Sequence, residues 1–255
     1  MNKRVRKQRK QSTRDISADL EEMSLQQQER EDAVKFNIIK NLEINKNIKH
    51  KNAKQKELCK AIMENEIVFV AGAAGTGKTL LSLKTALELL KKDNNYKRIL
   101  LTKPIVEAGE SIGFLPGDIE SKTDPYMGSF LGNFSKLIGA EKTNQLMQNE
   151  TIKAAPLAYL RGETFENCIA IIDETQNTTV SGLKLWLSRK GETSKLIVIG
   201  DTKQTDLQLR GSSKSGLEDA FHRFQGINNI GFVEFSEDDI VRSGILIELM
   251  KRYNV

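Results

Sequence analysis

Long hydrophobic runs are missing from this 255-residue sequence. No stretch approaches the roughly 18 uninterrupted apolar residues of a membrane-spanning helix, and no apolar core of a secretory signal follows the basic N-terminus. The only two cysteines, Cys59 and Cys168, are spaced for neither a disulfide framework nor a zinc site. We therefore expect a cytoplasmic protein with no membrane partner and with two buried or half-buried thiols.

Acidic residues are absent from residues 1–14, which hold seven Lys and Arg. Removing those seven from the 39 Lys and Arg leaves 32 against 34 Asp and Glu, so the remaining chain is close to neutral. Such a block repels itself and attracts polyanions, but it lacks the aromatic residues on which bases stack. A nucleic-acid-binding arm and a solubilising tail both remain open.

Residues 15–50 are polar and helix-prone, with a thin apolar stripe that includes Met23 and Leu25. A helix here needs a partner surface for stability, and the Lys- and Asn-rich segment at residues 44–52 indicates a linker. We therefore assign residues 1–50 to a basic, flexible N-terminal arm with a helix. Residues 51–255 are assigned to one folded domain.

From about residue 52 the pattern alternates between short apolar runs and amphipathic segments, which predicts an α/β fold with a parallel sheet sandwiched by helices. The predicted core strands are 67–71, 98–103, 168–172, 196–199 and 231–235. The predicted helices are one capped by Asn52, then 79–90, 127–138, 141–149, 179–189, 215–224 and 243–252.

A glycine-rich segment after the first predicted strand, GAAGTGKT at residues 72–79, matches the phosphate-binding loop (P-loop) pattern in full. Its glycines let backbone N–H groups curl around an anion at a helix N-terminus. Lys78 supplies a positive charge for the β- and γ-phosphates, and the Thr79 hydroxyl is a hard ligand for Mg²⁺. We predict that ATP binds through Gly72, Ala73, Ala74, Gly75, Thr76, Gly77, Lys78, Thr79 and Leu80.

Two acidic residues, Asp173 and Glu174, follow the strand at 168–172. The carboxyl ends of strands in such sheets face the ligand crevice. Asp173 is predicted to hold Mg²⁺, and Glu174 to polarise the attacking water as a catalytic residue. A helix-capping Asp beside a solvated Glu is the alternative, which the preceding P-loop disfavours.

A third motif, Gly200-Asp-Thr-Lys-Gln204, ends the strand at 196–199. Gln204 is predicted to reach the γ-phosphate as a further catalytic residue. Ordinary turn chemistry is the alternative for Asp201 and Gln204, because Asp is a common turn former.

Together these motifs resemble the PhoH-like ATPases, whose core is similar to the first motor domain of superfamily-1 helicases, a P-loop NTPase (RecA-like) fold. The resemblance extends from about Gln55 to the C-terminus. It is carried by the P-loop and by the segments 106–110, 113–118, 156–162, 173–177, 200–204 and 214–217.

The resemblance implies roles for residues outside these motifs. Gln55 stands where such motors use a glutamine to read adenine, and a surface helix residue is the alternative. Thr102-Lys103-Pro104 stands at the family's Thr-Arg-Pro position, which helicases use near the bound single-stranded nucleic acid. Lys103 replaces the Arg, which keeps the positive charge but loses the paired hydrogen bonds that a guanidinium group can donate. Thr175 replaces the usual Ala. Three arginines, Arg161, Arg210 and Arg242, are candidates to sense or complete the phosphate site, Arg210 and Arg242 as catalytic residues, with surface salt bridges as the alternative.

An arginine finger stabilises charge on a transferring phosphoryl group. About twenty residues follow the last predicted strand, too few for a second motor domain, so another copy of the chain is expected to supply the finger. The resemblance suggests a homo-oligomeric ring, a hexamer.

The leading hypothesis is a Mg²⁺-dependent ATPase coupled to single-stranded nucleic acid, RNA or DNA. An ATPase that remodels a protein partner and a nucleotide-dependent binding switch with little turnover remain the alternatives. Glu174 and Gln204 argue against the switch. They also fit a motor ATPase better than a small-molecule kinase.

Overall fold

The computed structural model describes residues 23, 25–104, 119–155, 157–160, 162–202, 215–241 and 252. The chain divides into two compact units, Met1–Leu42 and Glu43–Val255. In the first unit residues 25–40 form a helix, as the helix-prone composition predicted. The Lys- and Asn-rich residues 44–52 contain no helix or strand, but they belong to the second unit, so the boundary lies at residues 42/43 rather than at the predicted 50/51.

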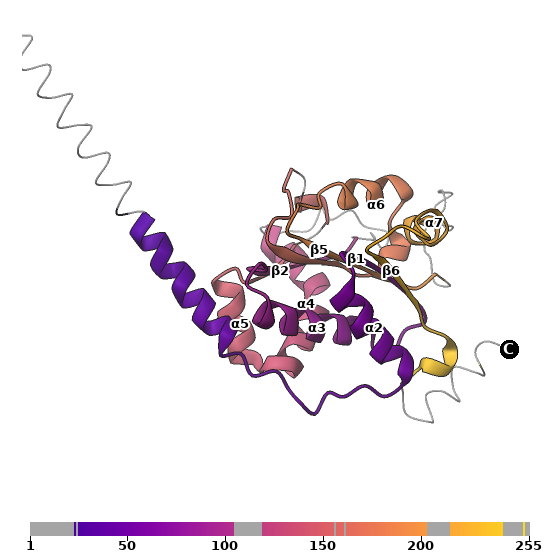
Figure 1. The fold of residues 1–255 in the computed structure, drawn as a ribbon, viewed down its shortest axis with the longest axis horizontal. Helices are drawn as coiled ribbons and strands as arrows, with labels where there is room; N and C mark the ends of the chain where they lie inside the picture. The colour runs from indigo at the N-terminus through magenta and orange to yellow at the C-terminus, as the bar shows by residue number, and fades with distance from the viewer. Residues whose placement is uncertain are drawn as a thin grey trace, which may run out of the picture. The chain divides into compact units, whose positions relative to one another are not determined.

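A six-stranded sheet forms the centre of the second unit (Figure 1). Side by side, its strands are β3 (Ile152–Ala154), β2 (Arg98–Thr102), β4 (Cys168–Ile172), β5 (Lys195–Gly200), β1 (Ile67–Ala71) and β6 (Ile230–Glu234). All of these pairings are parallel, so the carboxyl ends of the strands meet at one edge. The predicted parallel α/β sheet is confirmed.

Helices cover both faces of this sheet (Figure 1). On one face lie α2 (Ala53–Glu64), α3 (Lys78–Lys92), α4 (Ile119–Ile138) and α5 (Ala140–Gln148). On the other face lie α6 (Val180–Leu187) and α7 (Gly216–Arg223). Short 3₁₀ turns, η2 (Leu157–Leu160), η3 (Thr175–Asn177) and η5 (Glu237–Asp239), complete the described elements.

The sequence located most of these elements to within a few residues. Strands β1 and β4 have the predicted bounds, and the side chain of Asn52 caps α2 by accepting a hydrogen bond from the Gln55 backbone N–H. Helix α4 begins at residue 119 rather than 127 and contains Pro125, a residue that usually ends helices. Strand β3 was not predicted. The helix predicted at 243–252 lies outside the described residues except for Arg252.

The core on the α6 and α7 face of the sheet is built from aromatic and branched side chains. Phe69 in β1 is fully buried, and its ring lies 5.3 Å from that of Phe232 and 5.8 Å from that of Phe224. On the α6 face, Trp186 packs edge-on against Phe165 at 5.6 Å. The two ring contacts of Phe69 hold β1, the strand that leads into the P-loop.

Neither cysteine forms a disulfide in the structure. Cys168 is buried in β4, where desolvation raises the pKa of its thiol to about 11, and Cys59 on α2 is partly exposed. The expected buried and half-buried thiols are therefore confirmed. Within the described residues no helix has both the length and the hydropathy to cross a bilayer.

Truncating Phe69 tests how strongly this core holds the sheet. Because the ring is fully buried and packs against two other aromatic rings, we expect Phe69→Ala to lower the free energy of unfolding by about 3–5 kcal/mol. Urea denaturation followed by circular dichroism measures the change. Leu185→Ala, at a side chain 49% exposed, is the control and should alter stability by less than about 0.5 kcal/mol.

Candidate nucleotide-binding site

The three predicted motifs meet at the carboxyl edge of adjacent strands. The P-loop leaves β1, Asp173 leaves β4, and Asp201 leaves β5, which lies between them. They enclose a pocket of about 310 Å³, within the usual size range of small-molecule sites, about 300–1,000 Å³. The pocket is lined by Ala74, Gly75, Gly77, Lys78, Thr79, Leu80, Asp173, Glu174, Gln176, Gly200 and Asp201.

The P-loop owes its shape to two glycine positions. Gly77, the residue before α3, has a φ of 87°, a left-handed conformation that glycine adopts without strain. At Gly72, an added Cβ would lie 2.6 Å from the Cβ of Phe235, so no larger residue fits where the strand ends. The loop therefore curls at the N-terminus of a 15-residue helix, where free N–H groups and the helix dipole favour an anion.

The Lys78 ammonium lies inside this loop. It donates hydrogen bonds to the carbonyl oxygens of Ala73, at 2.8 Å, and Gly72, at 2.5 Å. Burial lowers the pKa of Lys78, while the carboxylates of Asp201, Asp173 and Glu174 oppose that shift. The charge of Lys78 is thus held where a phosphate group would enter.

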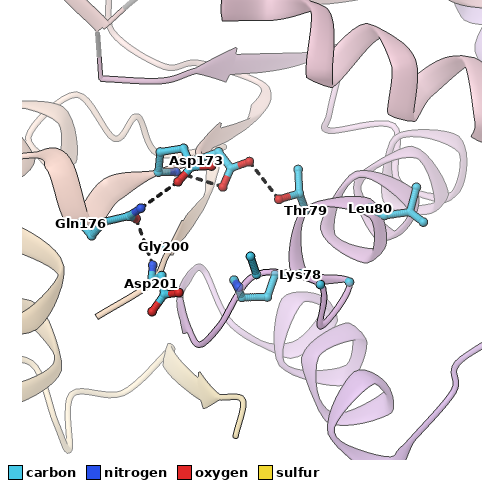
Figure 2. A pocket seen from close by; sticks show the side chains of 11 residues that line it. Lys78, Thr79, Leu80, Asp173, Gln176, Gly200 and Asp201 are labelled. Carbon is cyan, nitrogen blue, oxygen red and sulfur yellow. Dashed lines mark hydrogen bonds between the residues drawn. The ribbon is translucent and has the colours of Figure 1, made fainter. Parts of the chain in front are cut away.

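The two predicted magnesium ligands are in direct contact. The Thr79 hydroxyl donates to Oδ2 of Asp173 at 2.9 Å (Figure 2). Asp173 is only 6% exposed, and burial raises its pKa, although Lys103 and the bond from Thr79 counteract this effect. A cation at this place would offset the cost of burying the carboxylate.

These oxygen donors fit Mg²⁺. The described residues contain no group of three or more His, Cys, Asp or Glu side chains placed for a metal. Mg²⁺ in nucleotide sites commonly uses one or two protein ligands, with waters and phosphate oxygens completing its octahedron. Thr79 and Asp173 therefore suit a metal that arrives with a nucleotide.

Glu174 adopts an uncommon backbone conformation beside this pair. Its φ of 57° lies in the left-handed region, where a residue other than glycine costs conformational energy. Its backbone N–H donates to Oδ1 of Asp173 at 3.0 Å. The exposed Glu174 side chain lines the pocket, next to the predicted metal ligands.

Gln176 lies in the segment 173–177 that carries the family resemblance, and its position in the sequence predicted no role for it. In the structure it is 4% exposed, and its Nε2 donates to Oε2 of Glu174 at 2.7 Å. Its Oε1 accepts from the backbone N–H of Asp201 at 3.0 Å (Figure 2). The residue order after β4 gave no sign of this contact, which depends on the neighbouring strand.

The remaining P-loop residues support the loop from within. Thr76 is fully buried and its hydroxyl donates to the Ala73 carbonyl at 3.0 Å. Leu80 lines the pocket, but Figure 2 shows its side chain pointing away from Asp173. Gly72, Ala73 and Thr76 are not among the lining residues.

Gln55 lies behind the P-loop. It is 3% exposed, so the alternative of a surface helix residue is wrong. Its Nε2 donates to the Thr76 carbonyl at 2.9 Å, and its Oε1 accepts from the backbone N–H of Lys51 at 2.6 Å. The backbone N–H of Val241 donates to the next carbonyl of the loop, that of Gly75, at 3.0 Å. The carbonyls of Gly75 and Thr76 are thus each bound by a residue from another segment of the chain, Val241 and Gln55.

Lys103 contacts α4. Its ammonium donates to the Ser129 hydroxyl at 2.8 Å and lies 4.9 Å from the centre of the Phe130 ring. Thr102 before it is buried at the end of β2, and its carbonyl accepts from the backbone N–H of Asp173 at 3.0 Å. Gln204, Arg161, Arg210 and Arg242 lie outside the described residues, so their roles stay predictions.

The family model for PhoH-like proteins matches residues 47–254, which contain all of the site just described. The chain belongs to the PhoH-like family. It is 42% identical over 217 residues to a PhoH-like protein of Bacillus subtilis (strain 168), an alignment that covers 83% of this chain and 67% of that one. Protein PhoH of Escherichia coli (strain K12) is 40% identical over 207 residues, which cover 80% and 57% of the two chains.

This PhoH-like chain therefore spans 57–67% of the length of those curated relatives. Among solved structures, the large terminase of a thermophilic bacteriophage, in complex with ADP, aligns with 79% of this chain and 48% of its own. That alignment has 11% identity and a TM-score of 0.44, too low to support any conclusion. The fold rests on the strand order given above.

Removing the Gln55 amide tests its contact with the loop. Gln55→Ala leaves the Thr76 carbonyl without its partner, so we expect the free energy of unfolding to fall by about 1–3 kcal/mol. Because the contact is with the loop backbone, the affinities for ADP and GDP should weaken by the same factor, measured by calorimetric titration. Lys56→Ala, at the exposed neighbouring residue, is the control. A loss confined to ADP would instead support adenine recognition.

The buried Asp173 carboxylate should destabilise the metal-free fold at neutral pH. Burial raises the pKa of Asp173 in the folded protein above its value in the unfolded chain. The protonated carboxyl therefore stabilises the fold fully at pH values below the unfolded pKa, and this stabilisation is lost as the pH rises through the folded pKa. We expect Asp173→Asn to be more stable than wild type at pH 7 in chelator, with the difference shrinking on acidification. Denaturant titrations across this pH range measure it, and equal stability at pH 7 would contradict the expectation.

Proposed function

We propose that this PhoH-like chain is a Mg²⁺-dependent ATPase. One observation carries the proposal: the loop with Lys78, the Thr79–Asp173 pair and Glu174 come from separate motifs and line one pocket. A binding site alone requires the loop and a metal ligand. The second carboxylate, beside the first, is the group that hydrolysis needs in addition.

In this proposal the backbone N–H groups of residues 74–80 and the Lys78 ammonium hold the β- and γ-phosphates of ATP. Thr79 and Asp173 would hold Mg²⁺, which neutralises phosphate charge when bound. Lys78 exchanges its bonds to the Gly72 and Ala73 carbonyls for bonds to phosphate oxygens. Each of these groups stabilises the charge that spreads over the γ-phosphoryl oxygens during transfer.

Glu174 acts in this proposal as the residue that orients the attacking water and accepts its proton. Its carboxylate lies on the pocket wall, one residue from the metal ligand Asp173. Gln204 is proposed to contact the γ-phosphate, and Arg210 or Arg242 to complete the site. Gln55 supports the loop in this proposal through its bonds to the Thr76 carbonyl and the Lys51 N–H, and the adenine contact that the family resemblance implies is the alternative that the ADP and GDP titrations test.

Coupling to single-stranded nucleic acid, RNA in the first instance, is the proposed use of the hydrolysis. It is supported by the seven Lys and Arg among residues 1–14, a charge pattern that attracts polyanions. A homo-oligomeric ring, in which a neighbouring copy supplies the arginine, is proposed on the family resemblance.

Phosphate release from ATP with Mg²⁺ tests the proposal, measured with and without single-stranded RNA at two salt concentrations. We expect turnover by wild type, loss of nucleotide binding in Lys78→Ala, and a fall in kcat of about 10²- to 10⁴-fold in Glu174→Gln with binding retained. Stimulation by RNA should fade steeply with salt, because contacts with phosphates release counterions.

The outcomes separate the alternatives. Turnover that no nucleic acid changes would argue against RNA coupling and favour a protein partner. Nucleotide binding without phosphate release in wild type would favour a binding switch. Failure to bind any adenine nucleotide at millimolar concentration would overturn the proposed site itself.

A further inference from the structure

The side chain of Gln176 spans the loops that follow two neighbouring strands. Its Nε2 reaches the Glu174 carboxylate after β4, and its Oε1 reaches the Asp201 backbone N–H after β5. A primary amide is suited to this position, because it carries a donor and an acceptor at one terminus. A carboxylate would lack the donor, and a thioether would lack the donor and accept only weakly.

The place of Gln176 is built into the fold. The 3₁₀ turn η3 holds its backbone, with the Thr178 N–H donating to the Thr175 carbonyl at 2.9 Å. Gly200 leaves room for the amide, since a Cβ there would lie 2.7 Å from Oε1 of Gln176. The amide is therefore fixed before any ligand enters.

Glu174 lacks such surroundings of its own. Glu174 is exposed, whereas Gln176, two residues later, is buried. An exposed glutamate samples several rotamers, and only those directed at the attacking water are productive. The bond from Gln176 is assisted by the negative charge of the carboxylate, which makes it stronger than a bond between neutral groups.

We propose that Gln176 is a positioning residue that aims the Glu174 carboxylate and links its position to the backbone at Asp201. This inference rests on the proposed function, because it assigns Glu174 the role of base. Gln176 also lines the pocket, but the two hydrogen bonds of its amide described above go to the protein, so the role assigned here is through Glu174. Since one amide joins both loops, a shift of the chain at Asp201 moves the carboxylate that activates water.

The test is a double-mutant cycle that combines Gln176→Met with Glu174→Gln. We expect Gln176→Met alone to lower kcat by about 10- to 100-fold, the cost of a misplaced catalytic group. The dissociation constant for ADP with Mg²⁺ should stay within about twofold of wild type, which also shows that the pocket is folded. In the Glu174→Gln background the same change should lower the residual kcat by less than about twofold, because the group it positions is already gone.

Two further variants keep the test decisive. Gln148→Met makes the same exchange at an exposed residue of α5 and should leave kcat unchanged. If Gln176→Met no longer binds ADP, Gln176→Asn replaces it in the cycle. Asn keeps a polar amide but is one methylene too short to reach both partners.

Losses of kcat that multiply in the double variant would overturn the proposal, as would a single variant with wild-type kcat. If Glu174→Gln binds ADP but hydrolyses ATP at the wild-type rate, Glu174 is not the base, and this inference is overturned as well. That result is distinct from a failure of nucleotide binding, which concerns Lys78 and the loop.

Discussion

The parallel pairing of β4, β5 and β1 is the constraint on which the site depends. It aligns Ala71 with Gly200 and Ile171 with Ile197, so the chain leaves all three strands at one edge. Hydrogen bonds extend this alignment beyond the strands, from the Gly72 N–H to the Gly200 carbonyl at 3.2 Å. A shift of one residue in any of these strands would turn its side chains to the opposite face and separate the motifs.

Elements with a strong local signal could be predicted from the sequence. The run of apolar residues 168–172 has a strand on either side and helices on both faces, so nearly every position must be hydrophobic. Strand β3 has only three residues, one of them a partly exposed lysine, and it pairs on a single side. Its formation depends on β2 supplying partners for its backbone, which no pattern within residues 152–154 records.

The same distinction applies to the site. The P-loop and Asp173 are specified by neighbouring residues in the chain, so the sequence predicted that they share a site. Gln55 and Gln176 act through contacts with other segments, 21 and 25 residues away. Their side chains face the P-loop and the backbone after β5, so their contacts depend on how the sheet brings separate segments together. A single sequence identifies such residues as polar but does not identify their partners.

The bonds of the Lys78 ammonium to carbonyls of its own loop have a consequence for the proposed binding of a phosphate. A phosphate that enters must take the place of those carbonyls, so the free energy gained is the difference between two sets of bonds. If ATP is cleaved here as proposed, the same carbonyls can accept the ammonium again once the phosphate has left. In the proposed ATPase the buried lysine would therefore keep hydrogen-bond acceptors both with and without a bound phosphate, so release of the product would not leave its charge unpaired.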